Sequence, residues 1–209
     1  MLKKRKNNRT KEQGAETKKL LYACAEELFK AYDYQSVSVE SITRMAGVTK
    51  GTFYVHFESK DALLLEMIMD YVNRMDTQYE AFLESLPNEM PTADVMLALV
   101  DKIIALMTEQ LGCENMKAVY QMQLSDKVNM DAVKGYSRKL YGLFQTVLER
   151  GIKRQEFVSD LSQEALTRHF VMAIRGLTYE WCIRYPDFDL RKEATVHFRL
   201  LLDGIRAKS

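Results

Sequence analysis

The stretch Ala46-Gly-Val-Thr-Lys-Gly-Thr-Phe-Tyr-Val-His-Phe57 decides the fold of the N-terminal part of this chain, because it predicts a sharp turn followed by a new helix. Gly47 stands where a chain that leaves one helix must take a positive φ, which glycine does at the least steric cost. Thr49 follows as the predicted N-cap, and Phe53 and Phe57, four residues apart, share the buried face of the new helix. The pattern is typical of the turn and second helix of a helix-turn-helix, whose second helix enters the major groove of DNA.

The opposite face of this predicted helix carries hydrogen-bond donors and one glycine, where the backbone can approach a phosphate closely. We therefore expect DNA contacts from Thr49, Lys50, Gly51, Thr52, Tyr54 and His56. Replacing Lys50 should either relax the preference at one base position or weaken binding uniformly, depending on whether it meets a base edge or a phosphate.

The flanking residues predict two further helices. Ser38 is placed as an N-cap, with Val37 and Ile42 at the two positions of a hydrophobic staple, so a short helix precedes the turn. Ser59 is the predicted N-cap of a third helix and leaves Lys60 in the first turn, where we expect it to meet a phosphate. We include Ser38 and Lys60 among the predicted DNA contacts.

Residues 38–64, SVESITRMAGVTKGTFYVHFESKDALL, resemble the DNA-binding signature of the TetR family of bacterial transcriptional repressors. Order, spacing and residue type all agree over this contiguous segment, which makes a chance match rare. One departure is Thr43, where the family usually has a small alanine packed against the recognition helix. A threonine methyl group can pack there, so the departure affects fine geometry and leaves the resemblance intact.

The resemblance implies an all-α fold of about nine helices. It implies an N-terminal three-helix DNA-binding domain and a larger C-terminal domain that binds an effector and forms a homodimer through the last two helices. We accordingly expect a flexible basic arm over residues 1–12, the helix-turn-helix domain over 13–60, and the effector and dimerisation domain over 61–209. The implied partners are a double-stranded operator, a small-molecule effector of unknown identity, and a second copy of the chain.

Composition is compatible with this interpretation. The 209 residues are 47% hydrophobic and 28% charged, with three prolines and nine glycines, which leaves room for long helices. There is no apolar run long enough to span a membrane and no apolar signal-peptide core, so we expect a cytoplasmic protein without a membrane partner. The three cysteines (Cys24, Cys113 and Cys182) are far apart in sequence; buried reduced thiols are the favoured interpretation, with a redox sensor as the alternative.

Charge is distributed unevenly along the chain, although the net charge is only +1. Residues 1–60 hold twelve Lys and Arg against seven Asp and Glu, a net of +5, and the remainder therefore carries −4. A basic N-terminal third on an acidic body is typical of a protein that meets nucleic acid with one end. Half of these twelve Lys and Arg lie in residues 2–11, which are either a solubilising tail or an arm that follows phosphates or enters the minor groove.

Helical periodicity continues through the rest of the chain, with no sustained strand-like alternation. We expect a first helix over 14–32 and a long one over 59–86 that ends before two prolines. The further helices expected are 92–111, 114–124, 131–155, 162–185 and 189–205. Since the long helix starts in the DNA-binding domain and ends in the second one, displacement of its far end would tilt the recognition helices.

The last two predicted helices each carry an apolar stripe, and their short connection makes them antiparallel. We assign the dimer interface to these stripes, although packing within one chain explains them equally well. The residues assigned are Leu166, Phe170, Ile174, Leu177, Trp181, His197, Phe198, Leu201 and Ile205.

An effector pocket in the second domain would be lined by apolar side chains. The chain has twelve methionines, which either fill the core or line a pocket that repacks around apolar ligands. Tyr120, Arg175 and Tyr179 are the polar residues we predict to orient a ligand, with a salt bridge to Glu180 or across an interface as the alternative role of Arg175.

No catalytic constellation emerges from the sequence. The sequence has no phosphate-binding loop and no nucleophile elbow, and His169 and His197 have no metal-ligating residue at the right spacing on their own helices. We therefore expect no enzyme activity, cofactor or metal. His169 is better explained as a core or interface histidine than as a ligand. The leading hypothesis is a repressor that leaves a pseudo-palindromic operator when a small, largely apolar effector binds. A nucleoid or cell-division factor without an effector is second, and a small helical enzyme is third.

Overall fold

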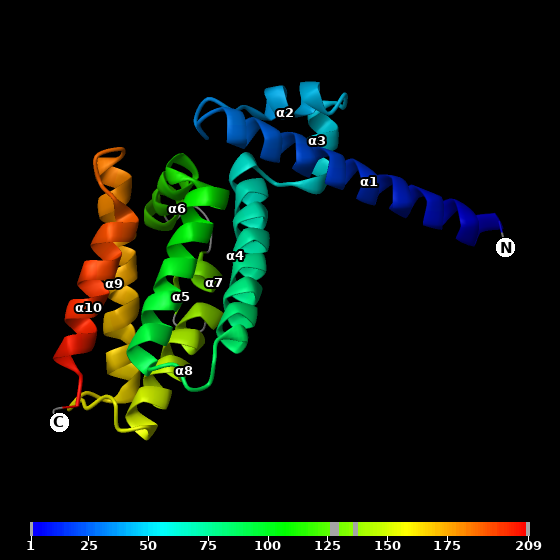
Figure 1. The fold of residues 1–209 in the computed structure, drawn as a ribbon. Coiled ribbons are helices and arrows are strands. Elements are labelled where there is room, and N and C mark those ends of the chain that lie inside the picture. The colour runs from blue at the N-terminus through cyan, green and yellow to red at the C-terminus, as the bar shows by residue number, and fades with distance from the viewer. Residues whose placement is uncertain (1, 126–129, 136–137, 208–209) are drawn as a thin grey trace. The chain divides into compact units, whose positions relative to one another are not determined.

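The computed structural model describes residues 2–125, 130–135 and 138–207. Every regular element in these ranges is helical, apart from an isolated antiparallel bridge between Phe157 and Arg206. The predicted all-α class is confirmed (Figure 1). The chain forms two compact units: residues 1–70 with 118–129, and residues 71–117 with 130–209.

Two helices contain the boundaries between the units. The division falls between Asp70 and Tyr71 within α4 (Lys60–Ser85), and between Lys117 and Ala118 within α6 (Cys113–Ser125). The sequence-based boundary after residue 60 lies instead at the start of α4. As expected, the long fourth helix contributes residues to both units.

The first unit is built on α1 (Leu2–Ala31), α2 (Val39–Met45), α3 (Lys50–His56) and the first part of α4. Leu21 and Ala25 on α1, Ile42 on α2, Phe53 on α3 and Leu63 on α4 are fully buried, and these five side chains form its core. Apolar residues at helical spacing on each short helix therefore meet one supporting helix, α1, which packs against both α2 and α3.

The segment expected as a basic arm, residues 1–12, belongs largely to α1, whose first residue is Leu2. Figure 1 shows these first turns of α1 extending beyond α2 and α3. The Lys and Arg residues that dominate this end of α1 are good helix formers, although Asn7, Asn8 and Thr10 are weaker ones. A role of the segment in DNA binding stays a prediction.

The second unit has α5 (Thr92–Leu106) at its centre. Val95, Met96, Leu99, Ile103 and Ile104 are each at most 2% exposed, which agrees with the prediction that this helix is buried on several sides. The helix continues as one π-helical segment, η1 (Met107–Leu111), and stops before Gly112 with φ +77°.

Two helices, α8 (Lys139–Lys153) and α10 (Leu190–Gly204), pack against α5, and α9 (Gln163–Arg184) packs against both of them. α9 and α10 begin at the N-caps Ser162 and Asp189, and they lie side by side in Figure 1. The ring of Phe198 on α10 lies 6.2 Å from that of Phe144 on α8 and 5.9 Å from that of Phe170 on α9. These aromatic contacts join the three helices into one core.

The single helix expected over residues 131–155 is interrupted. The structure has a short α7 (Asp131–Lys134), and Gly135 and Arg138 both adopt extended backbone before α8 begins. The apolar periodicity of this segment did not reveal the break, although glycine is a poor helix former and marks its place. Tyr136, expected on the inward face of the longer helix, lies outside the described residues.

A buried ion pair fixes the start of α8 to the second part of α4. The Arg138 Nη2 atom lies 2.9 Å from the Asp76 Oδ1 atom, and its Nε donates to the Oδ2 atom at 3.3 Å. The Asp76 side chain is only 4% exposed. This two-point contact satisfies a carboxylate that would otherwise be buried without a partner.

Candidate nucleic-acid interface

The turn between α2 and α3 has the geometry that its sequence predicts. Gly47 has a φ of +66°, in the left-handed region that glycine adopts readily. The amide of Gly47 donates to the Arg44 carbonyl at 3.2 Å, and the amide of Val48 donates to the Thr43 carbonyl at 3.0 Å. These bonds satisfy the last carbonyls of α2 and turn the chain sharply into α3.

Side-chain caps define the start of each helix. The Ser38 hydroxyl accepts from the Ser41 amide at 3.0 Å, while the Ser41 hydroxyl accepts from the Ser38 amide, completing a capping box. The Thr49 hydroxyl accepts from the Thr52 amide at 3.2 Å, and Ser59 caps α4 through the Ala62 amide. All three predicted N-caps are therefore present, and they fix where α2, α3 and α4 begin.

Two aromatic rings hold α3 against the first unit. Phe53 is fully buried and Phe57 is 4% exposed, and their ring centroids are 5.6 Å apart. Thr43, the departure from the family pattern, is also buried, with its hydroxyl bonded to the Glu40 carbonyl. Its methyl group therefore takes a place in the core, and the hydroxyl is satisfied within α2.

The opposite face of α3 is open to solvent, as the sequence predicts. Lys50, Gly51 and Tyr54 are exposed, whereas Thr52 and His56 are half-buried. The Thr52 hydroxyl lies 2.9 Å from that of Thr49, so part of its hydrogen-bonding capacity is used within the cap. DNA contact by these residues stays a prediction, and the structure brings them together on one surface.

Lys60 lies in the first turn of α4, as the sequence predicts, but its ammonium group makes hydrogen bonds within the protein. Its ammonium group donates to the carbonyls of Tyr34 and Val37, both at 2.7 Å, and lies 4.0 Å from the centroid of the Tyr34 ring. Burial lowers the pKa of Lys60, and the carboxylates of Asp61 and Asp33 partly offset this effect. Lys60 thus joins the α1–α2 loop to the start of α4. Two of the three N–H groups of its ammonium serve these carbonyls, and the predicted phosphate contact would use the third.

Tyr34 reinforces this attachment. Its hydroxyl donates to the Asp61 carboxylate, and burial together with this hydrogen bond raises the pKa of Tyr34. The tyrosine ring also packs 5.5 Å from the ring of Phe29 on α1. The loop before α2 is therefore held between α1 and α4, which positions the helix-turn-helix on its support.

The comparisons with known proteins agree with this geometry. Residues 21–67 match the family model described as bacterial regulatory proteins, tetR family. The transcriptional regulator AcrR of Shigella flexneri is 25% identical over 93% of this chain and 92% of its own length. The transcriptional repressor BepR of Brucella suis is 23% identical over 95% of this chain and 96% of its own length.

The chain belongs to the TetR family. It is a DNA-binding transcriptional regulator with a helix-turn-helix. The fold of this TetR-family chain is also similar to the crystal structure of the transcriptional regulator FadR from Bacillus subtilis in complex with stearoyl-CoA. That likeness has a TM-score of 0.69 at 18% identity, over 90% of this chain and 98% of FadR.

The polar residues expected to bind an effector in this TetR-family chain lie on two helices, α6 and α9. Tyr120 belongs to the first unit, whereas Arg175 and Tyr179 lie on α9 in the second. The Arg175 guanidinium lies 5.2 Å from the centroid of the Tyr141 ring, and Glu180, its alternative partner, pairs with Arg184. An effector role for the three predicted residues stays a prediction.

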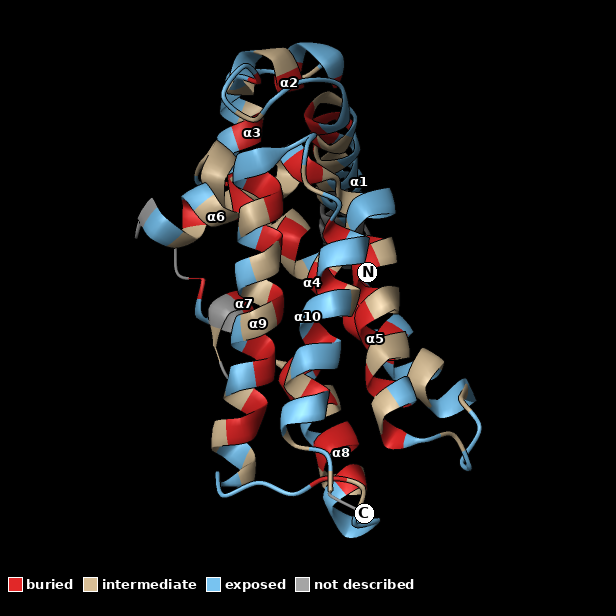
Figure 2. Cartoon of the chain, turned by 60° about the vertical axis from the view of Figure 1, so that its left-hand side comes forward, coloured by how far each residue is buried: buried red, intermediate tan, exposed pale blue. Residues whose placement is uncertain are grey.

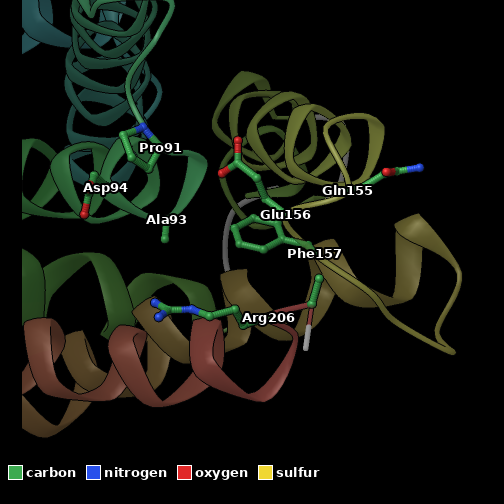
Figure 3. Close-up of a pocket in the computed structure, with 8 residues that line it drawn as sticks. Pro91, Ala93, Asp94, Gln155, Glu156, Phe157 and Arg206 are labelled. Carbon is green, nitrogen blue, oxygen red and sulfur yellow. The ribbon is translucent and has the colours of Figure 1, made fainter. Parts of the chain in front are cut away.

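A surface pocket of about 590 Å³ opens in the second unit, and none of these three residues is among those that line it. Figure 3 shows Glu156 and Phe157 between Pro91 and Arg206, which line it. The Glu156 carboxylate accepts from the Thr92 amide at 2.6 Å, so it is engaged at the start of α5. This pocket lies where the start of α5, the loop after α8 and the residues that follow α10 meet.

The predicted dimer residues need a correction. Five of the nine are buried within the second unit and cannot reach another molecule: Leu166, Phe170, Ile174, Trp181 and Phe198. Leu177, Leu201 and Ile205 are half-buried, and His197 is exposed. The stripe recognised in the sequence is mainly the intrachain core, because α8 and α5 pack against that side of α9 and α10.

Other apolar side chains of α9 and α10 face outward. Met172, Tyr179 and Ile183 on α9 and Val196 and Leu200 on α10 are each between 48% and 66% exposed. Figure 2 shows such exposed positions along both helices, alternating with buried ones. We call these five residues the outer apolar face.

Two properties of the chain bear on other functions. Within the described ranges, no helix has the length and apolar character needed to cross a membrane. In the same part of the chain, no cluster of three His, Cys, Asp or Glu side chains could hold a metal ion. The three cysteines, Cys24, Cys113 and Cys182, are free and buried.

Proposed function

We propose that this regulator is a repressor that binds a pseudo-palindromic operator as a homodimer and leaves it when a small, largely apolar effector binds the second unit. The observation that carries the proposal is the surface of α3: a buried pair of phenylalanines on one side and exposed Lys50, Gly51 and Tyr54 on the other. A helix held in this way can present its donors to the major groove without changing its support.

The outer apolar face supports a dimer. Met172, Tyr179 and Ile183 recur at intervals of seven and four residues, with Gly176 between them on the same side of α9. Such spacing is typical of a helix that packs lengthwise against a partner helix, and a glycine lets two backbones approach closely. Val196 and Leu200, four residues apart, continue the surface on α10.

The core of the second unit supports an apolar effector. Met75 on α4 and Met96 on α5 are buried in this unit, and methionine repacks more readily than branched residues. The similar FadR structure contains stearoyl-CoA, whose acyl chain is apolar. Stearoyl-CoA is therefore the first probe to test.

The coupling between effector and DNA would pass through α4, which contributes residues to both units. A dimer binds two half-sites only when its recognition helices keep a separation of about 34 to 36 Å per helical turn of DNA. An effector that fits only a conformer with the far part of α4 displaced would favour the wrong spacing. Effector binding would then weaken operator binding, and the reverse. The size of this coupling cannot exceed the difference in the effector's affinity for the two states.

The test starts from a pool of random duplexes, from which the full-length protein selects its binding site. The selected site should be pseudo-palindromic, and the protein should bind it more tightly than scrambled DNA in a fluorescence anisotropy titration. Saturating stearoyl-CoA should lower this affinity by about 5- to 150-fold, the usual range of allosteric coupling.

Three results would contradict separate parts of the proposal. Failure to enrich any sequence would remove the assignment of sequence-specific DNA binding. Tight binding of stearoyl-CoA with unchanged operator affinity would refute the coupling and leave DNA binding intact. Replacing Leu200 by Arg on the outer apolar face should give a monomer in sedimentation analysis, and an unchanged dimer would exclude that face as the interface.

A further inference from the structure

The outermost side chain of α3 is apolar, although the surface around it is polar. Val55 is 79% exposed, the largest exposed fraction among the large hydrophobic side chains described. Because successive residues of a helix are rotated by about 100°, Val55 lies directly opposite the midpoint of Phe53 and Phe57. It therefore points away from the core along the line on which α3 would enter a groove.

The neighbours of Val55 leave its methyl groups prominent. Gly51 precedes it by four residues on the same side of the helix and contributes no side chain. Tyr54 and Lys50 lie on one flank, and Thr52 lies on the other, with its hydroxyl engaged by Thr49. The backbone at Gly51 can therefore approach a surface closely, and the two Val55 methyl groups project beyond it.

A single exposed apolar residue needs no explanation on most protein surfaces. This one lies on a helix assigned to DNA binding, within the basic first sixty residues of the chain. The major groove presents one apolar group on its base edges, the C5-methyl group of thymine. Contact between that methyl group and Val55 would remove both from water, whereas contact with any other base edge would desolvate a polar group without a partner.

We propose that Val55 reads a thymine methyl group in each half-site of the operator. The inference rests on the proposed function, since it needs α3 in the major groove. It makes Val55 a specificity-determining residue, while Lys50 and Tyr54 supply hydrogen bonds and attraction to phosphate. The sequence analysis selected DNA contacts by their hydrogen-bond donors, so it did not identify Val55, whose side chain donates no hydrogen bond.

The experiment combines a protein change with a DNA change at the level of one methyl group. Wild-type protein and Val55→Ala are titrated against the selected operator and against operators in which each thymine is replaced in turn by deoxyuridine. Deoxyuridine lacks only the C5-methyl group and keeps every hydrogen-bonding atom. Fluorescence anisotropy gives the four affinities of a double-mutant cycle for each thymine.

At one thymine per half-site, deoxyuridine should weaken wild-type binding about fourfold, and about fifteenfold when both half-sites are changed, as expected for losing one methyl contact each. Val55→Ala is present in both subunits of the dimer, so it should lose about fifteenfold on the natural operator. On the operator with deoxyuridine in both half-sites, Val55→Ala should bind as tightly as the wild-type protein does, since both contacts are already absent. Val55→Ala should fold normally because the side chain is exposed, and a thermal unfolding curve checks this.

Leu124→Ala is the matched control. Leu124 is 77% exposed on α6, so its removal deletes an equally exposed apolar side chain outside the helix-turn-helix. This variant should show the wild-type loss on each deoxyuridine operator. A loss of the deoxyuridine effect in Leu124→Ala would mean that the effect is indirect, and it would overturn the proposal.

Three further outcomes would overturn the inference while the proposed function stands. They are unchanged operator affinity in Val55→Ala, additive effects of the two changes at every thymine, and a selected operator without thymine in its half-sites. If the wild-type protein selects no sequence at all, both the proposed function and this inference fail. The selection step therefore separates the two failures.

Discussion

Lys60 offers a sharp test of how the structure differs from the sequence-based expectation. Replacing it by methionine keeps the aliphatic stem and removes the ammonium group that bonds the carbonyls of Tyr34 and Val37. Because these two bonds hold the loop in the folded protein, Lys60→Met should detach the α1–α2 loop from the start of α4. If Lys60 instead serves a phosphate, the same change weakens DNA binding and leaves the fold intact.

The magnitude follows from the interactions that the ammonium group makes. A hydrogen bond to a charged group contributes about 1.5 to 3 kcal/mol, and the contact with the Tyr34 ring adds about 0.5 to 1 kcal/mol. Burying the charged ammonium group is itself unfavourable, as the lowered pKa of Lys60 shows. The methionine variant avoids this unfavourable burial, which offsets part of the loss. Partial exposure lets water replace some of the bonding, so we expect the free energy of unfolding to fall by about 2 kcal/mol.

The assay pairs urea unfolding with the salt dependence of DNA binding. Lys60→Met should lower the urea midpoint and leave the slope of log K against log salt unchanged. A phosphate contact in each half-site would flatten that slope by about 1.8 for the dimer. Lys50→Met is the matched control: Lys50 is exposed on α3, so this variant should lose DNA affinity and keep the wild-type urea midpoint. A wild-type urea midpoint together with a flattened slope in Lys60→Met would refute our reasoning.

Three further predictions concern stability. Asp76→Asn should destabilise the protein by about 3 kcal/mol in urea unfolding, because it leaves the Arg138 guanidinium without its carboxylate partner. Gly47→Ala should cost about 1 kcal/mol in the same measurement, since alanine is strained at a φ of +66° although nothing lies within 4 Å of the added methyl group. Burial raises the pKa of Tyr79 and raises that of Tyr71 to about 12, so the folded state retains phenol protons that the unfolded chain releases near pH 10. Stability should thus be full below pH 10 and fall above it, by up to about 1.4 kcal/mol per pH unit for each tyrosine.

Each of these predictions has a control on the same chain. Glu80→Gln removes an exposed ion pair with Lys139 and should change stability by less than about 1 kcal/mol. Gly142→Ala, at an open position inside α8, should stabilise the protein by up to about 1 kcal/mol. Tyr79→Phe should flatten the alkaline loss of stability measured by urea unfolding between pH 9 and 11, a range chosen around the ordinary tyrosine value of 10. An equal effect of Asp76→Asn and Glu80→Gln, or an unchanged alkaline slope, would contradict the corresponding argument.

The helix-turn-helix was predictable because its determinants are local. The caps Ser38, Thr49 and Ser59 act on amides three residues away, and Gly47 sets its own backbone conformation. Phe53 and Phe57 share a face by helical spacing alone. Interactions of this range are present in any short window of sequence, so order and spacing were enough to identify the motif and its exposed face.

The role of Lys60 was not predictable in this way. Its position in the first turn of α4 suggested a free cation near a phosphate. The tertiary fold brings the carbonyls of Tyr34 and Val37, more than twenty residues earlier in the chain, within 2.7 Å of its ammonium group. Every residue has a backbone carbonyl, so no sequence pattern could predict that these two would accept hydrogen bonds from Lys60.

The sequence by itself determined that this chain is helical, where most helices begin, and which side of α3 faces solvent. Only the tertiary structure decided which apolar stripe of α9 and α10 is core and which is outer surface. Both stripes repeat at helical spacing, and the difference depends on the partners: Phe144 from α8 covers the side with Phe198, whereas no described helix covers Leu200 on the other side of α10. Burial is a property of what packs against a residue, and for α9 and α10 those neighbours come from distant parts of the chain.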